Sequence, residues 1–244
     1  MSNWKWAVKD VGNNSNDSID SDVTGNATST TNVTVTSAFT LVSGQNDMTK
    51  DAGITPIVID LNGDGINTIA REDSSATFDL LGNGKAIKSG WLAGDDGFLA
   101  IDRNANGQID DISELFGGLN QGDGFSKLAS FDSNEDGLVD ANDTDFASLK
   151  IWQDMNGNRE TDEGELFSLE DAGIISLNVN FSALPYVDNQ GNLLLERSIA
   201  NLANGDTVEM TDVYFNVATA DALAANVELT SIASLVGADP VWMV

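Results

Sequence analysis

The stretch DSNEDGLVDAND, residues 132–143, carries oxygen-bearing side chains with the spacing of a calcium loop. A calcium loop takes ligands from positions one, three, five, nine and twelve, a backbone carbonyl from position seven, and glycine at position six. Gly137 stands at position six, and Asp143 replaces the longer glutamate usual at position twelve. Because few other chemistries require this spacing, the segment predicts a Ca²⁺ site made of Asp132, Asn134, Asp136, the Leu138 carbonyl, Asp140 and Asp143.

Apolar residues on both sides of this loop recur at helical spacing, namely Phe125, Leu128, Phe131, Phe146, Leu149 and Trp152. The pattern predicts a helix, the loop and a second helix, as in an EF-hand. These side chains are expected in the core, where their burial couples folding to metal capture.

A second loop follows directly and has a complete ligand set. Its candidates are Asp154, Asn156, Asn158, the Glu160 carbonyl, Asp162 and Glu165. Arg159 occupies position six, where a residue other than glycine pays a steric cost for a positive φ.

Two further loops have a good first half. One contains Asp102, Asn104, Asn106, Gln108, Asp110 and Glu114, with the closing glutamate one residue late. The other begins with Asp60, Asn62 and Asp64. Arg71 stands where its closing acid belongs, so Asp95 or Asp96 would have to arrive from elsewhere. A fifth turn, at Asp79, lacks suitable ligands and is interpreted as a degenerate structural turn.

Composition narrows the function classes. The 244 residues include 39 acidic and 11 basic ones, a formal charge of −28 that excludes a general affinity for nucleic acid. The acidic residues cluster with Asn and Gly, so we expect bound cations to neutralise the repulsion between their carboxylates. Since the chain has no Cys and no His, disulfides, thiol nucleophiles, the usual zinc sites and His-dependent triads are also excluded.

The first 53 residues differ in character from the rest. Strand-like alternation marks residues 32–36 and 39–42, which is too little for an independent core. With WKWAVKDVGN (4–13) and NDSIDSDV (16–23), this segment resembles the end of the B-type immunoglobulin-like repeats of bacterial surface adhesins. The resemblance implies calcium binding by Asp17, Asp20 and Asp22, and a solvated turn is the equal alternative.

Beyond residue 55, a series of short motifs has a recognisable order and spacing. They are PIVIDLNGDGI (56–66), KSGW (88–91), DDG (95–97), DRN (102–104), SELFG (113–117), WQD (152–154) and LEDAGI (169–174). Together they resemble the calcium-dependent self-processing module of RTX-type (FrpC-like) secreted proteins. The resemblance implies a secreted or surface protein whose module folds when it meets extracellular calcium.

Residue 55 decides whether self-processing itself is expected. In the resembled family an aspartate before the proline attacks its own main-chain carbonyl, which splits the Asp-Pro bond and leaves an anhydride that a lysine amine opens to an isopeptide. Here Thr55 precedes Pro56, and its hydroxyl cannot form the cyclic anhydride. We therefore expect no cleavage at this junction and no catalytic residue. Asp239-Pro240 is interpreted as a terminal turn, with cleavage there as the alternative.

The expected fold class is α+β, with small β-sheets, EF-hand-like helix-loop-helix calcium sites and, before them, strands of a truncated sandwich. The expected domains are 1–53, the calcium-binding module 54–218, and a C-terminal tail or helix, 219–244. Within the module we expect strands at 56–59, 98–101 and 175–181, a short helix at 168–173, and a hairpin joining 193–199 to 207–217 through Asn204-Gly205.

The leading hypothesis is a calcium-binding structural or adhesive module of a secreted or surface bacterial protein, with neighbouring domains of a larger exported protein as its partners. The N-terminus lacks the pattern of a cleaved signal peptide, and residues 222–244 are too polar to span a bilayer. The alternative is an autocatalytic Asp-Pro cleaving and isopeptide-crosslinking module. A carbohydrate or ice binder is a third hypothesis, by analogy with adhesins alone.

Overall fold

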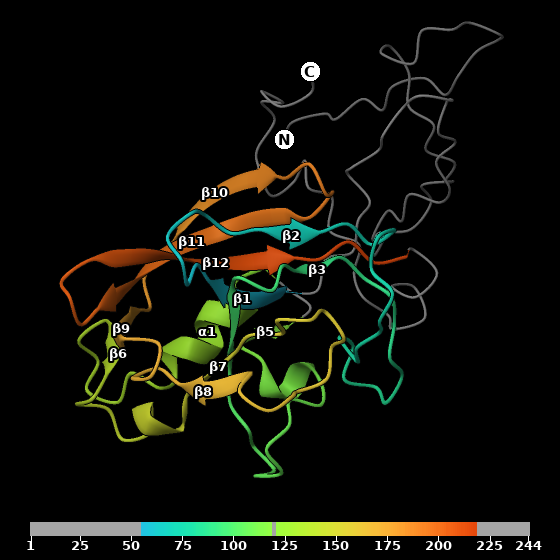
Figure 1. The fold of residues 1–244 in the computed structure, drawn as a ribbon. Coiled ribbons are helices and arrows are strands. Elements are labelled where there is room, and N and C mark those ends of the chain that lie inside the picture. Colours follow the sequence, from blue (N-terminus) through green and yellow to red (C-terminus); the bar gives the residue numbers. More distant parts are fainter. Residues whose placement is uncertain (1–54, 119–120, 219–244) are drawn as a thin grey trace, which may run out of the picture. The chain divides into compact units, whose positions relative to one another are not determined.

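The computed structural model describes residues 55–118 and 121–218, which form a mostly β fold (Figure 1). Its single α-helix within these residues is α1 (Asp123–Ala129), and its short 3-10 turns include η2 (Ile112–Glu114) and η3 (Phe146–Ser148). The strands are β1 (Thr55–Ile59), β2 (Thr68–Ile69), β3 (Trp91–Leu92), β4 (Gly97–Ala100), β5 (Gly117–Gly118), β6 (Leu138–Asp140), β7 (Lys150–Trp152), β8 (Leu166–Ser168), β9 (Ile174–Asn178), β10 (Ser182–Val187), β11 (Leu193–Leu202) and β12 (Thr207–Tyr214).

Most strands join one antiparallel sheet that curls into a half-barrel. Its order is β6-β9-β11-β12-β1-β4-β7-β8, with β10 paired to β11 and β5 paired to β1, while β2 and β3 form a separate pair. The long strands β11 and β12 are joined by a tight turn in which Gly205 has a φ of 91° (Figure 1). The predicted hairpin at Asn204-Gly205 is therefore confirmed, as are the predicted strands now seen as β1 and β4.

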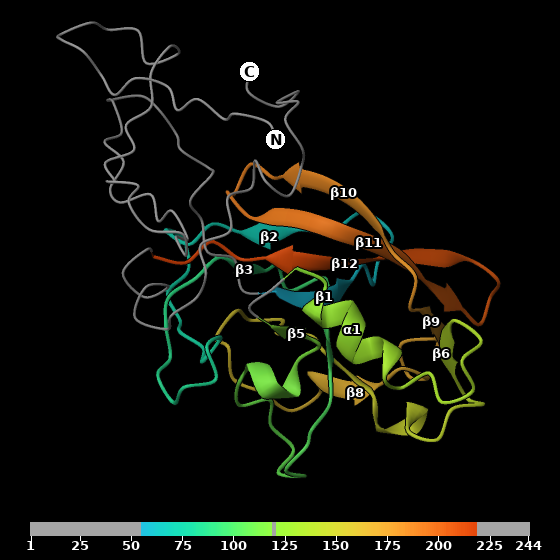
Figure 2. The same ribbon diagram turned by 180° about the vertical axis from the view of Figure 1, so that it is seen from behind.

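Strand β1 is buried on both faces because its side chains alternate between two apolar cores. Val58 joins one core, which contains Trp91, Phe98 and Trp152. Ile57 and Ile59 join the other, which contains Phe125 and Leu128 of α1. Figure 2 shows α1 lying against the sheet beside β1. The strand is thus held firmly, and its end delivers Asp60 to the first oxygen-rich loop.

The predicted α+β fold with helix-loop-helix sites is wrong. Helix α1 does precede the loop at Asp132, but β6 lies inside that loop, and the turn η3 and strand β7 follow it. The helical spacing of Phe146, Leu149 and Trp152 arises from one 3-10 turn running into a strand. Strand β7 pairs with β4 and β8, so tertiary pairing overrides the local period. The other loops follow strands instead of helices.

Two smaller predictions also need correction. Residues 168–173 form a hydrogen-bonded turn, not a helix, although the Ser168 hydroxyl accepts the Asp171 N–H at 3.0 Å and Gly173 ends the turn with a φ of 72°. The strand expected at 175–181 is β9, but Ile175 and Phe181 are 52% and 44% exposed. A register shift between β9 and β11 disturbs the simple alternation. The predictions for residues 1–53 and 219–244 lie outside the described residues.

Candidate metal centre

Five turns begin with an aspartate and share one hydrogen bond from the main chain to the aspartate side chain. In each, the aspartate carboxylate accepts the main-chain N–H of the residue five positions later. The distances are 3.0 Å from Gly65 to Asp60, 2.6 Å from Gly84 to Asp79, 2.8 Å from Gly107 to Asp102, 2.8 Å from Gly137 to Asp132, and 3.0 Å from Arg159 to Asp154. The first side chain of each turn therefore holds its backbone in a loop.

Position six of each loop lies in the left-handed region of φ. The value is 79° at Gly107, 91° at Gly137 and 63° at Arg159. Only Arg159 carries a Cβ there, so the positive φ that the sequence predicted for a residue other than glycine is confirmed in the loop at Asp154.

The loop at Asp132 is closed by Asp143. One oxygen of the Asp143 carboxylate accepts the N–H groups of Ser133 at 2.7 Å and Asn134 at 3.3 Å, while the other accepts the N–H of Asp140 at 2.9 Å. These hydrogen bonds, that of Asp140 first, lower the pKa of Asp143. The carboxylate therefore clamps the beginning of the loop to its end in the charged form that a cation requires.

Glu165 closes the loop at Asp154 in the same way. Its carboxylate is buried and accepts the N–H of Met155 at 2.9 Å and the N–H of Asp162 at 3.0 Å. These donors stand at positions two and nine of the loop, as Ser133 and Asp140 do in the previous one. The two loops thus share a closing geometry despite the different length of their closing side chains.

Glu114 closes the loop at Asp102, although it stands one residue late in the sequence. It accepts the N–H of Arg103 at 2.9 Å and the N–H of Asp110 at 2.9 Å. The extra residue is absorbed by η2, which starts after Asp111 and brings Glu114 back over the loop. A departure in sequence spacing therefore leaves the closing position intact.

The loop at Asp60 is closed by Asp96, which lies between β3 and β4. Its carboxylate accepts the N–H groups of Leu61 at 3.4 Å and Asn67 at 2.8 Å, and Asp96 is fully buried. Burial raises the pKa of Asp96 to about 7, despite these hydrogen bonds. The sequence left Asp95 and Asp96 open for this position, and the hydrogen bonds favour Asp96.

The other residues expected in the Asp60 loop lie together at its rim. The side chain of Asn62 accepts the N–H of Asp64 at 2.9 Å, and its amide donates to Asp95 at 3.4 Å. The amide of Asn67 donates to Asp64 at 2.9 Å. Asp95, which the sequence offered as the alternative to Asp96, therefore also lies at this loop and accepts a hydrogen bond there.

Side chains at positions three, five and nine meet in two of the loops. Their amides donate to the position-nine carboxylate, at 3.0 Å and 2.8 Å from Asn104 and Asn106 to Asp110, and at 2.7 Å and 2.9 Å from Asn156 and Asn158 to Asp162. Position seven also repeats, since the N–H groups of Gln108, Leu138 and Glu160 donate to the position-five side chain at 2.7, 3.0 and 2.8 Å. The three loops therefore share the position-seven contact, and the loops at Asp102 and Asp154 also share the amide contacts to position nine.

Within residues 55–118 and 121–218, no group of three or more acidic side chains lies close enough together to hold a metal ion. Amide donors fill the spaces between the carboxylates, as when Asn134 donates to Asp136 at 3.0 Å. Each of these amides also has a carbonyl oxygen that can ligate a cation. Hydrogen bonds join several of the predicted residues within each loop, and metal ligation by them stays a prediction.

Arg159 and Trp91 tie the loop at Asp154 to the segment before β3. The Arg159 guanidinium donates to the Ser74 hydroxyl at 2.6 Å and the Ser89 carbonyl at 2.7 Å, and it lies 4.3 Å from the centre of the Trp91 ring. The Trp91 indole N–H donates to Asp154 at 2.7 Å. Burial lowers the pKa of Arg159 to about 10, against the attraction of Asp154, so the side chain stays charged. No local pattern in the sequence signals this contact.

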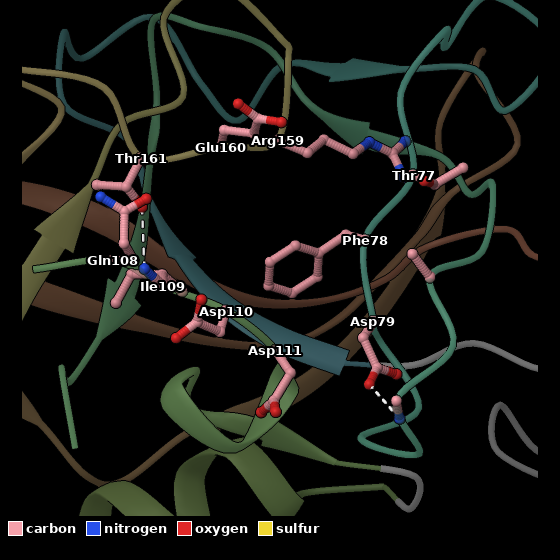
Figure 3. Close-up of a pocket in the computed structure, with 12 residues that line it drawn as sticks. Thr77, Phe78, Asp79, Gln108, Ile109, Asp110, Asp111, Arg159, Glu160 and Thr161 are labelled. Atoms are coloured by element: carbon pink, nitrogen blue, oxygen red, sulfur yellow. Dashed lines mark hydrogen bonds between the residues drawn. The ribbon is translucent and has the colours of Figure 1, made fainter. Parts of the chain in front are cut away.

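A hollow of about 410 Å³ lies where the turns at Asp79, Asp102 and Asp154 approach one another (Figure 3). Asp79, Asp110, Asp111 and Glu160 contribute carboxylates to its wall, and Phe78 lies among them. The carboxylate of Asp79 accepts the N–H groups that hold its own turn, which agrees with a structural role for that turn.

One known protein family covers the region that holds the motifs and the closed loops. The SPM domain matches residues 57–216, well over half of the chain. The chain belongs to the SPM domain family. One relative of this SPM domain is the iron-regulated protein FrpA of Neisseria meningitidis serogroup C, which is 36% identical over 166 residues.

The match to FrpA covers 65% of this chain and 15% of the relative, so the chain spans a small part of that protein's length. The SPM domain is therefore compared with one region of a much larger protein. Among the described residues, no helix has the length and apolar character needed to cross a membrane.

Proposed function

We propose that this SPM domain binds calcium in the loops that begin at Asp60, Asp102, Asp132 and Asp154, and that the bound ions stabilise its fold. One observation carries the proposal. In all four loops a closing carboxylate accepts main-chain N–H groups from both ends of the loop, whether it comes from within the loop or, as with Asp96, from far along the chain. The four loops therefore share the closed shape that a ring of oxygen ligands around one ion requires.

The chemistry of the ligands favours calcium over other metals. The chain has no Cys and no His, so the ligands are oxygens from carboxylates, amides and main-chain carbonyls. Ca²⁺ accepts six to eight such oxygens in a flexible arrangement, whereas Mg²⁺ demands a compact octahedron. Neutral amides at positions three and five weaken the site, which suits calcium at the higher concentrations found outside cells.

Net charge supports a structural role for the ions. The chain carries a formal charge of −28, and each loop combines a position-one carboxylate with a closing carboxylate. Repulsion between neighbouring carboxylates costs about 1 kcal/mol per pair even with strong screening. A divalent cation in each loop converts this repulsion into attraction, so folding and metal binding support each other.

A calcium titration by calorimetry tests the proposal and counts the sites. Replacing Asp132 or Asp154 by alanine, or Asp96 by asparagine, is expected to remove about one equivalent each, because each change deletes one loop's first or closing carboxylate. Glu163→Gln is the matched control, since this exposed acid lies in the loop at Asp154 but outside its ligand set. An unchanged stoichiometry in all three variants would refute calcium binding by these loops.

The wider role follows from the resemblance and from the relative. We propose that the module belongs to a larger RTX-type protein that acts outside the cell or on its surface, where neighbouring domains are its partners. The match to a small region of FrpA and the expected need for abundant calcium support this context. An adhesive role would require a target surface, and binding assays on host or bacterial surfaces with and without calcium would test it.

Self-processing is the second candidate function, and the surroundings of residue 55 favour testing it. Thr55 is fully buried, and a Cβ placed on Gly117 would lie 1.4 Å from the Thr55 carbonyl oxygen, so this peptide group is tightly enclosed. Thr55→Asp is expected to restore calcium-triggered cleavage before Pro56 if the rest of the machinery is intact. Thr55→Asn, of similar size but without the carboxylate, is the control. Intact mass after calcium addition measures the outcome, and an uncut Thr55→Asp protein would exclude the activity.

A further inference from the structure

Asp212 of β12 is a buried carboxyl group without a hydrogen-bond partner. Its side chain is 0% exposed, and neither of its carboxylate oxygens has a partner among the described residues. Because β12 pairs Asp212 with Ile57, the side chain lies on the same face of the sheet as Thr55. The start of α1 closes the other side, since a Cβ on Gly124 would lie 2.7 Å from Asp212 Oδ2. Thr55 and Gly124 approach the carboxylate, but an ionised Asp212, shut off from solvent, would lack the full set of donors that a buried charge needs.

The charged and titratable groups that face Asp212 add to the problem. Glu196 of β11 is also 0% exposed, and its carboxylate accepts the Tyr214 hydroxyl at 3.1 Å. Asp123 on α1 adds a further negative charge to the field at Asp212. Lys127 on α1 is a cation that interacts with Asp212, and burial lowers the pKa of that lysine.

These surroundings shift the protonation of the pair. Burial first, and Glu196 next, raise the pKa of Asp212 well above its ordinary value, while the approach of Thr55 and Gly124 offsets only part of the rise. Burial likewise raises the pKa of Glu196, against the hydrogen bond from Tyr214. Both carboxyl groups therefore retain protons at a pH where exposed acids have lost theirs.

We propose that Asp212 and Glu196 form a proton-holding centre, called here the buried acid pair, that makes the fold lose stability as the pH rises. The folded state keeps a proton that the unfolded chain releases above about pH 4. Such a proton contributes its full stability below the unfolded pKa, and this contribution is lost as the pH climbs toward the folded pKa. For one retained proton, the unfolding equilibrium constant rises about tenfold per pH unit over that range.

The buried acid pair works against the calcium loops. Ligand carboxylates must be ionised to bind a cation, so acid weakens the loops, whereas base weakens the buried acid pair. The two together confine the stable fold to a window of pH. Neither Asp212 nor Glu196 is a candidate ligand in any of the four loops, so the proposal does not depend on calcium binding.

The test compares the pH dependence of unfolding in the full chain and in Asp212→Asn, which is nearly the same shape but cannot ionise. Urea unfolding followed by tryptophan fluorescence, at saturating calcium, is measured between about pH 6 and pH 9. Relative to Asp212→Asn, the unfolding constant of the unmodified protein is expected to rise with pH, by about tenfold per pH unit as long as the folded protein keeps its proton. This comparison cancels contributions from Asp96 and the loops. Parallel curves for the two proteins would overturn the proposal.

Two further measurements keep the test decisive. Asp206→Asn removes an exposed acid from the turn between β11 and β12, and it is expected to follow the unmodified protein at every pH. Should Asp212→Asn fail to fold, proton counting on the unmodified protein answers the question directly. The native state is expected to hold at least about one proton more than the urea-unfolded state near neutral pH, and equal proton numbers would overturn the proposal.

Discussion

Chelation of calcium is expected to remove most of the native structure of this SPM domain. A loop whose ion is present at a hundredfold excess over its dissociation constant stabilises the fold by about 2.7 kcal/mol. Four such loops contribute on the order of 10 kcal/mol, which rivals the whole free energy of unfolding of an ordinary domain. Far-UV circular dichroism measures the loss. Tryptophan fluorescence reports it locally, because the Trp91 indole donates to Asp154.

Salt provides the control for this experiment. If the cations acted only by screening the charge of −28, sodium chloride at high concentration would restore the fold as well as calcium does. Recovery with calcium but not with sodium chloride or magnesium is the expected result. A native spectrum in chelator, at nanomolar free calcium, would contradict the stabilising role altogether.

Arg159→Gly is expected to have the second-largest effect on stability, because the lost hydrogen bonds of the buried side chain outweigh the relieved backbone strain. Glycine relieves the strain of the positive φ at Arg159, which regains roughly 1 kcal/mol. The same change leaves the buried partners at Ser74 and Ser89 without their donor, which costs on the order of 3 kcal/mol. The calcium-loaded protein should therefore unfold at lower urea, with a red-shifted emission from Trp91.

Ala105→Gly is the matched control for Arg159→Gly. Ala105 also has a positive φ, 58°, but its side chain is exposed and makes no comparable anchor. Glycine there is expected to leave stability unchanged or to raise it by a few tenths of a kcal/mol. Equal effects of the two glycine substitutions would show that the Arg159 side chain contributes nothing beyond its backbone conformation.

The sequence revealed the loops more reliably than the fold around them. A calcium loop is local, so the spacing of Asp132, Asn134 and Asp136 suffices to indicate it, and the turn hydrogen bonds agree. The flanking structure is decided by partners distant in sequence. The apolar side chains of residues 146–152 recur at helical spacing. Residues 150–152 nevertheless form the strand β7, because they pair with β4 and β8. A period of three or four residues therefore indicated correctly the helix before Asp132, seen as α1, and wrongly a helix after the loop, where the sheet takes up a strand.

The residues that sequence reasoning missed act over long separations in the chain. Asp212 and Glu196 sit in strands whose pattern gives no sign that their side chains point inward. Arg159 was recognised as a departure from glycine, but its contacts reach Ser74 and Trp91, which lie 85 and 68 positions away in the sequence. A buried charge and its partners become visible only when strand register is known.

The closure of the Asp60 loop by Asp96 has a consequence for the order in which the loops would fill with calcium. If the loops bind calcium as proposed, the other three loops, which carry their own closing acid, would capture an ion while the surrounding chain is still loose. The Asp60 loop becomes complete only after β1 and the β3–β4 connection have docked, so its apparent affinity is reduced by the fraction of molecules in which that docking has occurred. It should fill last during assembly and empty first when the module begins to open, which makes its occupancy a gauge of completed folding.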